Sequence, residues 1–487
     1  MLALFAVVVL TAQYDNARTG ATLTETALTP ANVNSSKFGK LFSLPVDGDV
    51  YAQPLYLPHI EMPGKGTHNV LFVATEHDSV YAFDADGSSS EPLWRVNFLT
   101  DGATTVRAQD VRCPFILPEI GITPTPVIDY PSGTIYVLAR TKEDGRYVHR
   151  LHALAITTGA EKFGGPVEIK TPGFNGLREL PRAALLLAKG QVYLTWGSSC
   201  DVGPYHGWVM AYDAHKLTQT AVLNTSPDSE ESGIWQSDNG PAADDDGNVY
   251  VATGNGKFTL ASNGHDYGDS LLKLGLASSG LKVLDYFTPP NEQLLNKEDD
   301  DLGSGGPVVL PRAKGDKRQL VLVGGKDGRL YALDRDHLGK LGDANPVFKF
   351  RGGIYAAPAY WNGRVYVLAS GDYLSAFAVT NGALSDHPVS IGGERFGNPG
   401  ATPAISANGD KDGVVWLIDT KAWNGRDRPA LLHAYDASDV SREIYNTEQN
   451  SARDHLGLCL RFTIPTVANG KVYVETKKQI EVYGRLR

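Results

Sequence analysis

Histidine and acidic side chains occur together at two places in the sequence, and both sets could bind a metal ion. His77 and Asp78 lie in TEHDS, and His265 and Asp266 lie in NGHDYGDS. Histidine with carboxylate suits a transition metal, and carboxylates alone suit Ca²⁺. The same residue types also cap turns and hydrogen-bond neighbouring loops. Spacing in the sequence leaves both interpretations open, and turn capping is the favoured one.

Four basic residues in the C-terminal part of the chain are candidate ligands for an anion: Arg351, Arg395, Arg426 and Lys477. Guanidinium groups bind carboxylates through paired hydrogen bonds, so such a cluster could hold a carboxylate-rich ligand such as an acidic sugar. The alternative is that each side chain is solvated and paired with a local aspartate. The elements that position these residues decide whether they form a cluster.

Three phrases recur along the chain and define a repeat. The first is a run of small residues, usually with proline, such as YAQPLYL at Tyr51. The second is a β-rich run such as NVLFVAT at Asn69, which has eight copies spaced about 45 to 70 residues apart. The third ends in Asp and a polar turn, as in VYAFDADG at Val80. A fourth apolar run follows most copies.

Each repeat therefore predicts four antiparallel strands joined by tight turns, with no helical periodicity, which is typical of a propeller blade. We expect an all-β fold, a single eight-bladed β-propeller of four-stranded antiparallel blades. The last repeat has no room for a fourth strand, so the N-terminal strand 37–46 is expected to fill that place and close the ring. The predicted propeller covers 37–487, with blades at about 47–98, 120–170, 180–224, 235–288, 302–350, 353–391, 397–446 and 461–485.

Two features of the repeat have local explanations. The aspartate that ends the third phrase can accept backbone N–H bonds in the turn that follows. The proline of the first phrase suits an innermost strand, because proline tolerates an edge position that has no ladder partner.

The three cysteines divide into a pair and a single residue. In a propeller, the loops between the second and third strands share a face with the loops that enter each blade. Cys113 and Cys200 both fall on that face, in adjacent blades. We expect a disulfide between them in an exported protein, and two unpaired thiols otherwise. Cys459 is left over, and no CxxC or finger spacing indicates structural zinc.

Composition excludes several partners. The net charge is −10 over 487 residues, which argues against a nucleic-acid partner. No apolar run is long enough to span a membrane. The run MLALFAVVVL has the length of a signal-peptide core, so we expect a signal peptide at 1–13 with a possibly truncated start, followed by an extension at 14–36. The alternative is a buried N-terminal strand.

Several segments resemble a known family. GKVYV and LYALDRD are similar to the repeats of pyrroloquinoline-quinone propellers, which occur in quinoprotein dehydrogenases and in an outer-membrane assembly lipoprotein. YDNARTGATLTETALTPANV, DLGSGGPVVLP and FTIPTVANGKVYVET resemble an exported bacterial group of such repeat proteins, along nearly the whole chain from about residue 14. The resemblance implies the fold, and export to the periplasm or the exterior.

The resemblance also offers a function. Quinoprotein alcohol dehydrogenases use the quinone, a calcium ion, an Asp base and a disulfide between adjacent cysteines. This chain has no adjacent cysteine pair. We therefore expect an exported scaffold that binds a small molecule or a protein on its loop face. The alternatives are a dehydrogenase of alcohols or sugars that uses pyrroloquinoline quinone and Ca²⁺, with the quinone carboxylates on the four basic residues, or an envelope assembly component.

Overall fold

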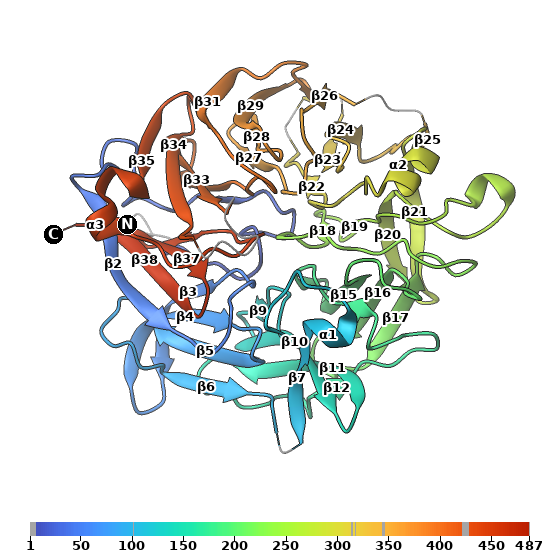
Figure 1. Cartoon of the computed structure of the whole chain (residues 1–487), viewed down its shortest axis with the longest axis horizontal. Coiled ribbons are helices and arrows are strands. Elements are labelled where there is room, and N and C mark those ends of the chain that lie inside the picture. The colour runs from blue at the N-terminus through green and yellow to red at the C-terminus, as the bar shows by residue number, and fades with distance from the viewer. Residues whose placement is uncertain are drawn as a thin grey trace.

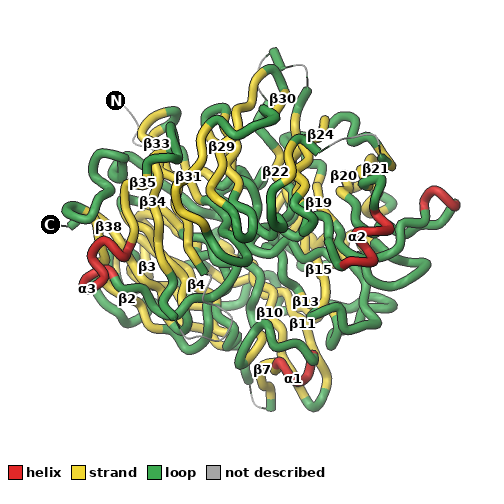
Figure 2. Tube along the Cα trace, turned by 45° about the horizontal axis from the view of Figure 1, so that its top comes forward, coloured by secondary structure: helices red, strands yellow, loops and turns green. Residues whose placement is uncertain are grey.

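The fold is described from a computed structural model of the chain, which describes residues 6–100, 102–312, 315–316, 318–342, 346–420 and 428–486. Within these residues the strands form eight sheets, and the sheets are arranged around a ring (Figure 1). Most of the chain is strand or loop, with a few short helical segments (Figure 2). The eight-bladed, all-β prediction is confirmed.

Blades one to four each contain four antiparallel strands, and blades two, three and four carry extra short strands. From the centre outward, blade one contains β3 (Leu55–Met62), β4 (Gly66–Ala74), β5 (Ser79–Asp84) and β6 (Trp94–Asn97), and blade two contains β9 (Val127–Asp129), β10 (Thr134–Glu143), β11 (Arg146–Ala155) and β12 (Val167–Glu168). Blade three contains β14 (Leu186–Ala188), β15 (Gln191–Ser198), β16 (Trp208–Asp213) and β17 (Gln219–Asn224), and blade four contains β18 (Ala242–Ala243), β19 (Val249–Ala252), β20 (Leu271–Ala277) and β21 (Gly280–Thr288). The additions are β7 (Ala103–Arg107), β8 (Glu119–Ile120), β13 (Glu179–Leu180) and β25 (Lys340–Leu341).

Blades five to eight follow the same plan. Blade five contains β22 (Val308–Val309), β23 (Leu320–Gly324), β24 (Arg329–Asp334) and β26 (Phe348–Lys349), and blade six contains β27 (Ala359–Trp361), β28 (Arg364–Val367), β29 (Tyr373–Thr380) and β31 (Ser390–Arg395), with β30 (Ala383–Leu384). Blade seven contains β32 (Ala404–Asn408), β33 (Lys411–Asp419), β34 (Leu431–Asp436) and β35 (Glu443–Asn446), with β1 (Ala21–Thr22). Blade eight contains β36 (Thr466–Ala468), β37 (Lys471–Thr476), β38 (Gln479–Arg485) and β2 (Phe38–Pro45).

Helical segments are short and lie between strands. They are α1 (Ala108–Val111), α2 (Glu292–Glu298), α3 (Ser451–Asp454) and the 3-10 turns η1 (Leu260–Ser262) and η2 (Thr447–Asn450). In the described part of the chain, none of them is long and apolar enough to cross a membrane.

The ring closes as the sequence predicts. Strand β2 pairs antiparallel with the last strand, β38, from Phe38 opposite Arg485 to Pro45 opposite Gln479. Figure 1 shows the two strands side by side, although they come from opposite ends of the chain. Phe38 is fully buried and packs against the rings of Trp416, Tyr445 and Tyr483. The closing strand therefore joins the last blade through both its backbone and its core.

The recurring Asp of the third phrase does what its position predicts. Asp84 Oδ1 accepts the amide of Asp86 at 2.8 Å, and Asp213 Oδ1 accepts the amide of His215 at 2.9 Å. Asp334 and Asp436 make the same bond to the amide two residues on. This turn ends the third strand of each of these blades, so the repeated aspartate is structural.

Two residues of the described part of the N-terminal apolar run pack inside the propeller. Val7 and Val9 are buried in the core of the first blade. Val9 exchanges both backbone hydrogen bonds with Tyr56 of β3, at 2.9 and 3.0 Å. This is the environment of a buried N-terminal strand, the alternative that the sequence left open. The signal peptide at 1–13 stays a prediction.

Candidate functional site

A central pocket of about 500 Å³ opens on the face formed by the loops that enter the blades and the loops between second and third strands. That is the face on which the sequence places the candidate residues. Every blade contributes at least one side chain, because the innermost strands converge there. The pocket is lined by Tyr51, Cys113, Phe115, Ile116, Ile120, Leu180, Arg182, Ser198, Ser199, Cys200, Asp201, Trp235, Ser237, Asp299, Asp301, Ser304, Lys326, Tyr355, Asn398, Pro399, Arg461 and Phe462.

Trp235 gives the pocket a flat aromatic surface. Its indole N–H donates to the carbonyl of Ser198 at 3.0 Å, which fixes the orientation of the ring. A Cβ atom at Gly197 would lie only 3.0 Å from the ring, and one at Gly233 only 2.7 Å. The two glycines let the backbone approach the indole closely. An indole held in this way can stack against a planar ligand.

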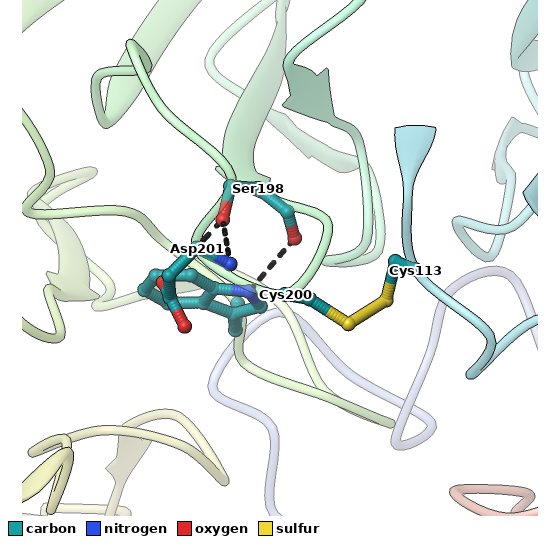
Figure 3. Close-up of a disulfide and its surroundings, with 5 residues drawn as sticks. Cys113, Ser198, Cys200 and Asp201 are labelled. Atoms are coloured by element: carbon teal, nitrogen blue, oxygen red, sulfur yellow. Dashed lines mark hydrogen bonds between the residues drawn. A yellow bond between two sulfur atoms is a disulfide. The ribbon is translucent and has the colours of Figure 1, made fainter. Parts of the chain in front are cut away.

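The predicted pair of cysteines is a disulfide in the structure, and it lies in the wall of the pocket. Cys113 precedes β8, and Cys200 lies in the loop between β15 and β16, at a sequence separation of 87 and a Cα–Cα distance of 5.6 Å. Figure 3 shows the bond joining the two loops, with Ser198 and Asp201 beside Cys200. The bond ties the wall contributed by blade two to the wall contributed by blade three.

Two aspartates share one lysine at the side of blade five. Lys326 Nζ donates to Asp299 Oδ1 at 2.7 Å and also contacts Asp301 Oδ2. Asn255 holds both acids, since its backbone N–H donates to Asp301 and its side-chain amide to Asp299, each at 2.7 Å. Burial raises the pKa of Asp301 to about 6, although Lys326 opposes this rise. Asp301 is therefore a carboxylate that can take up and release a proton near neutral pH.

The lysine is held in its charged form. Burial alone would lower the pKa of Lys326, but the two carboxylates raise it above its usual value. Gly254 makes the close packing possible, because a Cβ there would lie 2.1 Å from Asp301 Oδ1.

The opposite side of the pocket is cationic and aromatic. The Arg182 guanidinium lies 5.8 Å from the ring centre of Tyr51 and 5.7 Å from that of Phe462. The Arg461 guanidinium lies 4.3 Å from the ring centre of Phe115. Burial lowers the pKa of Arg461 to about 10, and the positive charge of Arg182 adds to this. An anionic group between the two guanidiniums would relieve their repulsion.

The four predicted metal ligands are not brought together. His77 after β4 bonds Glu119 of β8 at 3.0 Å, and His265 after β19 bonds Asp228 after β17 at 2.9 Å. Asp266 accepts the amide of Asp228 at 2.9 Å, while Asp78 is fully buried. Across the described ranges, no three His, Cys, Asp or Glu side chains are placed to hold a metal ion. These contacts agree with the turn-capping interpretation for His265 and Asp266.

Three of the four predicted basic residues, Arg351, Arg395 and Lys477, are not among the residues that line the central pocket. Arg351 and Arg395 are exposed, and Arg395 Nε donates to the carbonyl of Gly371 at 2.7 Å. Lys477 is half-buried, and its positive charge acts on Asp49. Arg426 falls outside the described residues. Their role as ligands stays a prediction, and the cations that line the pocket are Arg182, Lys326 and Arg461.

Sequence reasoning missed Arg182, Trp235 and Arg461, because none of the three belongs to the pattern of the repeat. Each stands a few residues before the innermost strand of its blade, β14, β18 or β36. These residues differ in type, but they share this position in the repeat. The shared position was the signal that could have identified them.

Three buried acids around the channel predict a pH dependence of stability. Burial raises the pKa of Glu76, Glu179 and Asp238 to about 8 in each case. Unfolded carboxyls lose their protons near pH 4, so at neutral pH the folded chain binds more protons than the unfolded chain. Stability therefore falls as pH rises. Burial lowers the pKa of His149 to about 3, which opposes this trend below pH 6.5.

We expect the free energy of unfolding to be lower by more than about 2 kcal/mol at pH 8.5 than at pH 6.5, measured by urea denaturation. An Asp238→Asn variant should have a shallower slope, because one titrating group is gone. Asp386→Asn is the control, since its side chain is 88% exposed. Equal stability at the two pH values would show that these acids are ionised in the folded chain.

Comparisons with known proteins agree with this architecture. No protein-family profile matches the chain, and no curated protein matches it. Among solved structures, it is similar to a quinohemoprotein alcohol dehydrogenase from Comamonas testosteroni, with 16% identity over 99% of this chain and 81% of that one, and a TM-score of 0.65. A europium-containing methanol dehydrogenase gives 14% identity over 98% of both chains, with a TM-score of 0.63.

A second kind of propeller is also similar. BamB from Moraxella catarrhalis gives 12% identity over 92% of this chain and 97% of that one, with a TM-score of 0.50. At such identities the likeness concerns the fold. In fold, the chain is therefore similar to propellers of the pyrroloquinoline-quinone, quinoprotein type.

Proposed function

We propose that the central pocket binds a planar, carboxylated quinone of the pyrroloquinoline-quinone class and that the chain is a dehydrogenase of a hydroxylated substrate. One observation carries the proposal. A flat indole, an inter-blade disulfide, a buried carboxylate–ammonium cluster and two guanidiniums line a single pocket of about 500 Å³. This volume is within the range of small-molecule and cofactor sites.

The residues present fit such a group. Trp235 supplies a stacking surface for a fused ring system. Arg182 and Arg461 supply positive charge for ring carboxylates, and both belong to the pocket lining. Sequence reasoning placed the quinone on Arg351, Arg395, Arg426 and Lys477 instead, of which Arg351 and Arg395 are exposed. Arg182 is buried and Arg461 is partly buried, so the two suit the role better, because charge pairing is stronger away from bulk water.

The chain's own residues would then manage the proton. When bound, a quinone of this class supplies the electrophile that accepts two electrons from the substrate. Asp301 Oδ2 is positioned to accept the hydroxyl proton of a substrate in the pocket, and its pKa of about 6 keeps it ionised at neutral pH. Lys326 holds that carboxylate in place and balances its charge. The aromatic side chains Tyr51, Phe115, Tyr355 and Phe462 limit the access of water.

We assign no step to a metal ion. Asp299 and Asp301 are already paired with an ammonium group, and the described residues contain no set of three acidic, histidine or cysteine ligands. The proposed proton transfer therefore involves no Ca²⁺.

Export is part of the proposal, and the Cys113–Cys200 disulfide supports it, because such bonds persist in oxidising compartments. The scaffold and envelope-assembly hypotheses predict a different result in the same test, since neither needs a quinone.

The test is a titration of the full chain with pyrroloquinoline quinone, followed by calorimetry and by tryptophan fluorescence. We expect saturable one-to-one binding. Trp235→Ala should weaken it by about 10- to 100-fold, through lost stacking. Arg395→Ala is the matched control and should bind as the unchanged chain does, whereas the sequence-based hypothesis predicts a loss.

Absence of binding up to about 100 µM quinone would mean a binding free energy weaker than about −5.5 kcal/mol. This result would contradict the proposal and favour a scaffold. Loss of binding in Arg395→Ala but not in Trp235→Ala would move the quinone away from this pocket.

A further inference from the structure

The N-terminal segment 9–25 bonds to all eight blades, and we call it the hub strap. Val9 bonds to β3 of blade one, and the carbonyl of Leu10 accepts from Ile128 of blade two at 2.8 Å. Asn16 Nδ2 donates to the carbonyl of Leu187 in blade three at 2.8 Å. The strap thus begins with the first three blades in ring order.

The remaining blades follow, again largely in order. The carbonyls of Asn16, Ala17, Thr19 and Gly20 accept amides of blades four, five, six and seven, at 2.6, 2.9, 2.7 and 2.8 Å. Strand β1 then runs parallel to β32 of blade seven. Blade eight bonds to Tyr14, whose hydroxyl accepts the amide of Val467 at 3.0 Å, and to Glu25 Oε2, which accepts the amide of Gly470 at 2.9 Å.

The bonds fall at one position of the repeat. In seven blades the donor is the amide two residues after the proline of the innermost strand. The donors are Tyr56, Ile128, Ala243, Val309, Tyr360, Ile405 and Val467, and the prolines are Pro54, Pro126, Pro241, Pro307, Pro358, Pro403 and Pro465. The proline itself has no N–H to donate, which agrees with its expected place at a strand edge. The strap supplies an acceptor for the amide two residues on, and its strand β1 also pairs with β32.

A buried arginine fastens the strap at its centre. Arg18 is fully buried and donates to the carbonyls of Leu185 and Pro241, at 3.0 and 2.9 Å, in blades three and four. It also donates to Thr11 Oγ1 and the carbonyl of Ala12, at 2.6 and 2.8 Å, which folds the strap back on itself. Four acceptors surround one guanidinium inside the channel.

We propose that the hub strap is the shared hydrogen-bonding partner that holds the eight innermost strands together and closes the far end of the channel. A buried amide without a hydrogen-bond partner destabilises the fold, so the strap, which accepts from seven such amides, stabilises all of these strands together. The bonded positions come several residues after the pocket lining, as Tyr56 does after Tyr51 and Val467 after Phe462. Ligands therefore enter and leave the central pocket through one mouth.

The strap also gives a consequence for processing. Removal of the predicted signal peptide at 1–13 would remove the contacts of Val9 and Leu10 with blades one and two, and the bonds that Thr11 and Ala12 accept from Arg18. Folding of the complete ring is expected to use these residues.

The test is hydrogen exchange of the full chain, read by mass spectrometry on peptides that cover the innermost strands. Arg18→Met keeps the bulk of the side chain and removes its hydrogen bonds. If the strap is a shared partner, β22, β27 and β32 should exchange about tenfold faster or more, although Arg18 touches only blades three and four. Leu23→Ala is the matched control within the strap, since Leu23 is 52% exposed.

Faster exchange confined to β14 and β18, or equal effects in Arg18→Met and Leu23→Ala, would overturn the proposal. If Arg18→Met does not fold, Asn16→Ala replaces it, because that side chain reaches only the carbonyl of Leu187. Exchange rates are then compared between blade three, which Asn16 contacts through this bond, and the distant strands β22, β27 and β32, and faster exchange in the distant strands supports the proposal.

Discussion

An Asp301→Asn chain is expected to bind the quinone and to oxidise substrate at least about 100-fold more slowly than the unchanged chain. The amide cannot accept the hydroxyl proton, while its size preserves the packing against Gly254 and the bond from the Asn255 amide. Steady-state rates with an artificial electron acceptor measure the loss, and the calorimetric titration measures quinone binding separately. A fall in rate with binding retained identifies a proton acceptor.

The pH profile adds a second measurement. Because the pKa of Asp301 is about 6, the rate of the unchanged chain should rise as pH increases through 6 and then level off. Asp299→Asn is the matched control, since Asp299 shares Lys326 but is 64% exposed and should affect the rate less. If the two variants lose equal activity, or if the rise near pH 6 persists in Asp301→Asn, Asp301 is not the base.

Much of the fold could be predicted because its determinants are local. Strand alternation, the glycine-containing turns and the Asp84-type turn repeat within about 60 residues of sequence. Ring closure by β2 followed from counting strands in the last blade. The Cys113–Cys200 pair followed from blade order, since two loops of adjacent blades share one face.

The site resisted prediction for a different reason. Its side chains come from one or two positions in each blade and meet only when the ring closes, so Tyr51 and Phe462 become neighbours of one arginine, Arg182. Charge alone pointed to Arg351 and Arg395, which are exposed, because sequence does not distinguish an arginine at the mouth of the channel from one on the outer surface.

The hub strap could not be predicted from the sequence either. Its residues 9–25 have no repeat, since successive parts of the segment contact different blades, and most of its acceptors are backbone carbonyls, which accept bonds whatever side chains the residues carry. Only the partner strands carry a pattern, the proline two residues before each donor. The innermost strands that bond to the strap can therefore be recognised from the sequence, whereas the strap itself cannot.

The inter-blade disulfide should affect both stability and binding. A Cys113→Ser/Cys200→Ser chain is expected to lose about 2–4 kcal/mol of unfolding free energy, because the bond closes a long loop across two blades. The same change frees the pocket walls of blades two and three from each other, so quinone affinity should fall as well. Urea denaturation and the quinone titration measure the two effects, and the reduced form of the unchanged chain should reproduce both.

Cys459→Ala separates the disulfide from a general response to reductant. Cys459 takes no part in the bond, so this chain should still lose affinity and stability when reduced. A double variant that is less stable but binds the quinone as tightly as before would limit the disulfide to holding the loops together. Loss of affinity without loss of stability would instead mean that the sulfur atoms themselves contact the bound ring, because the walls would then still be in place.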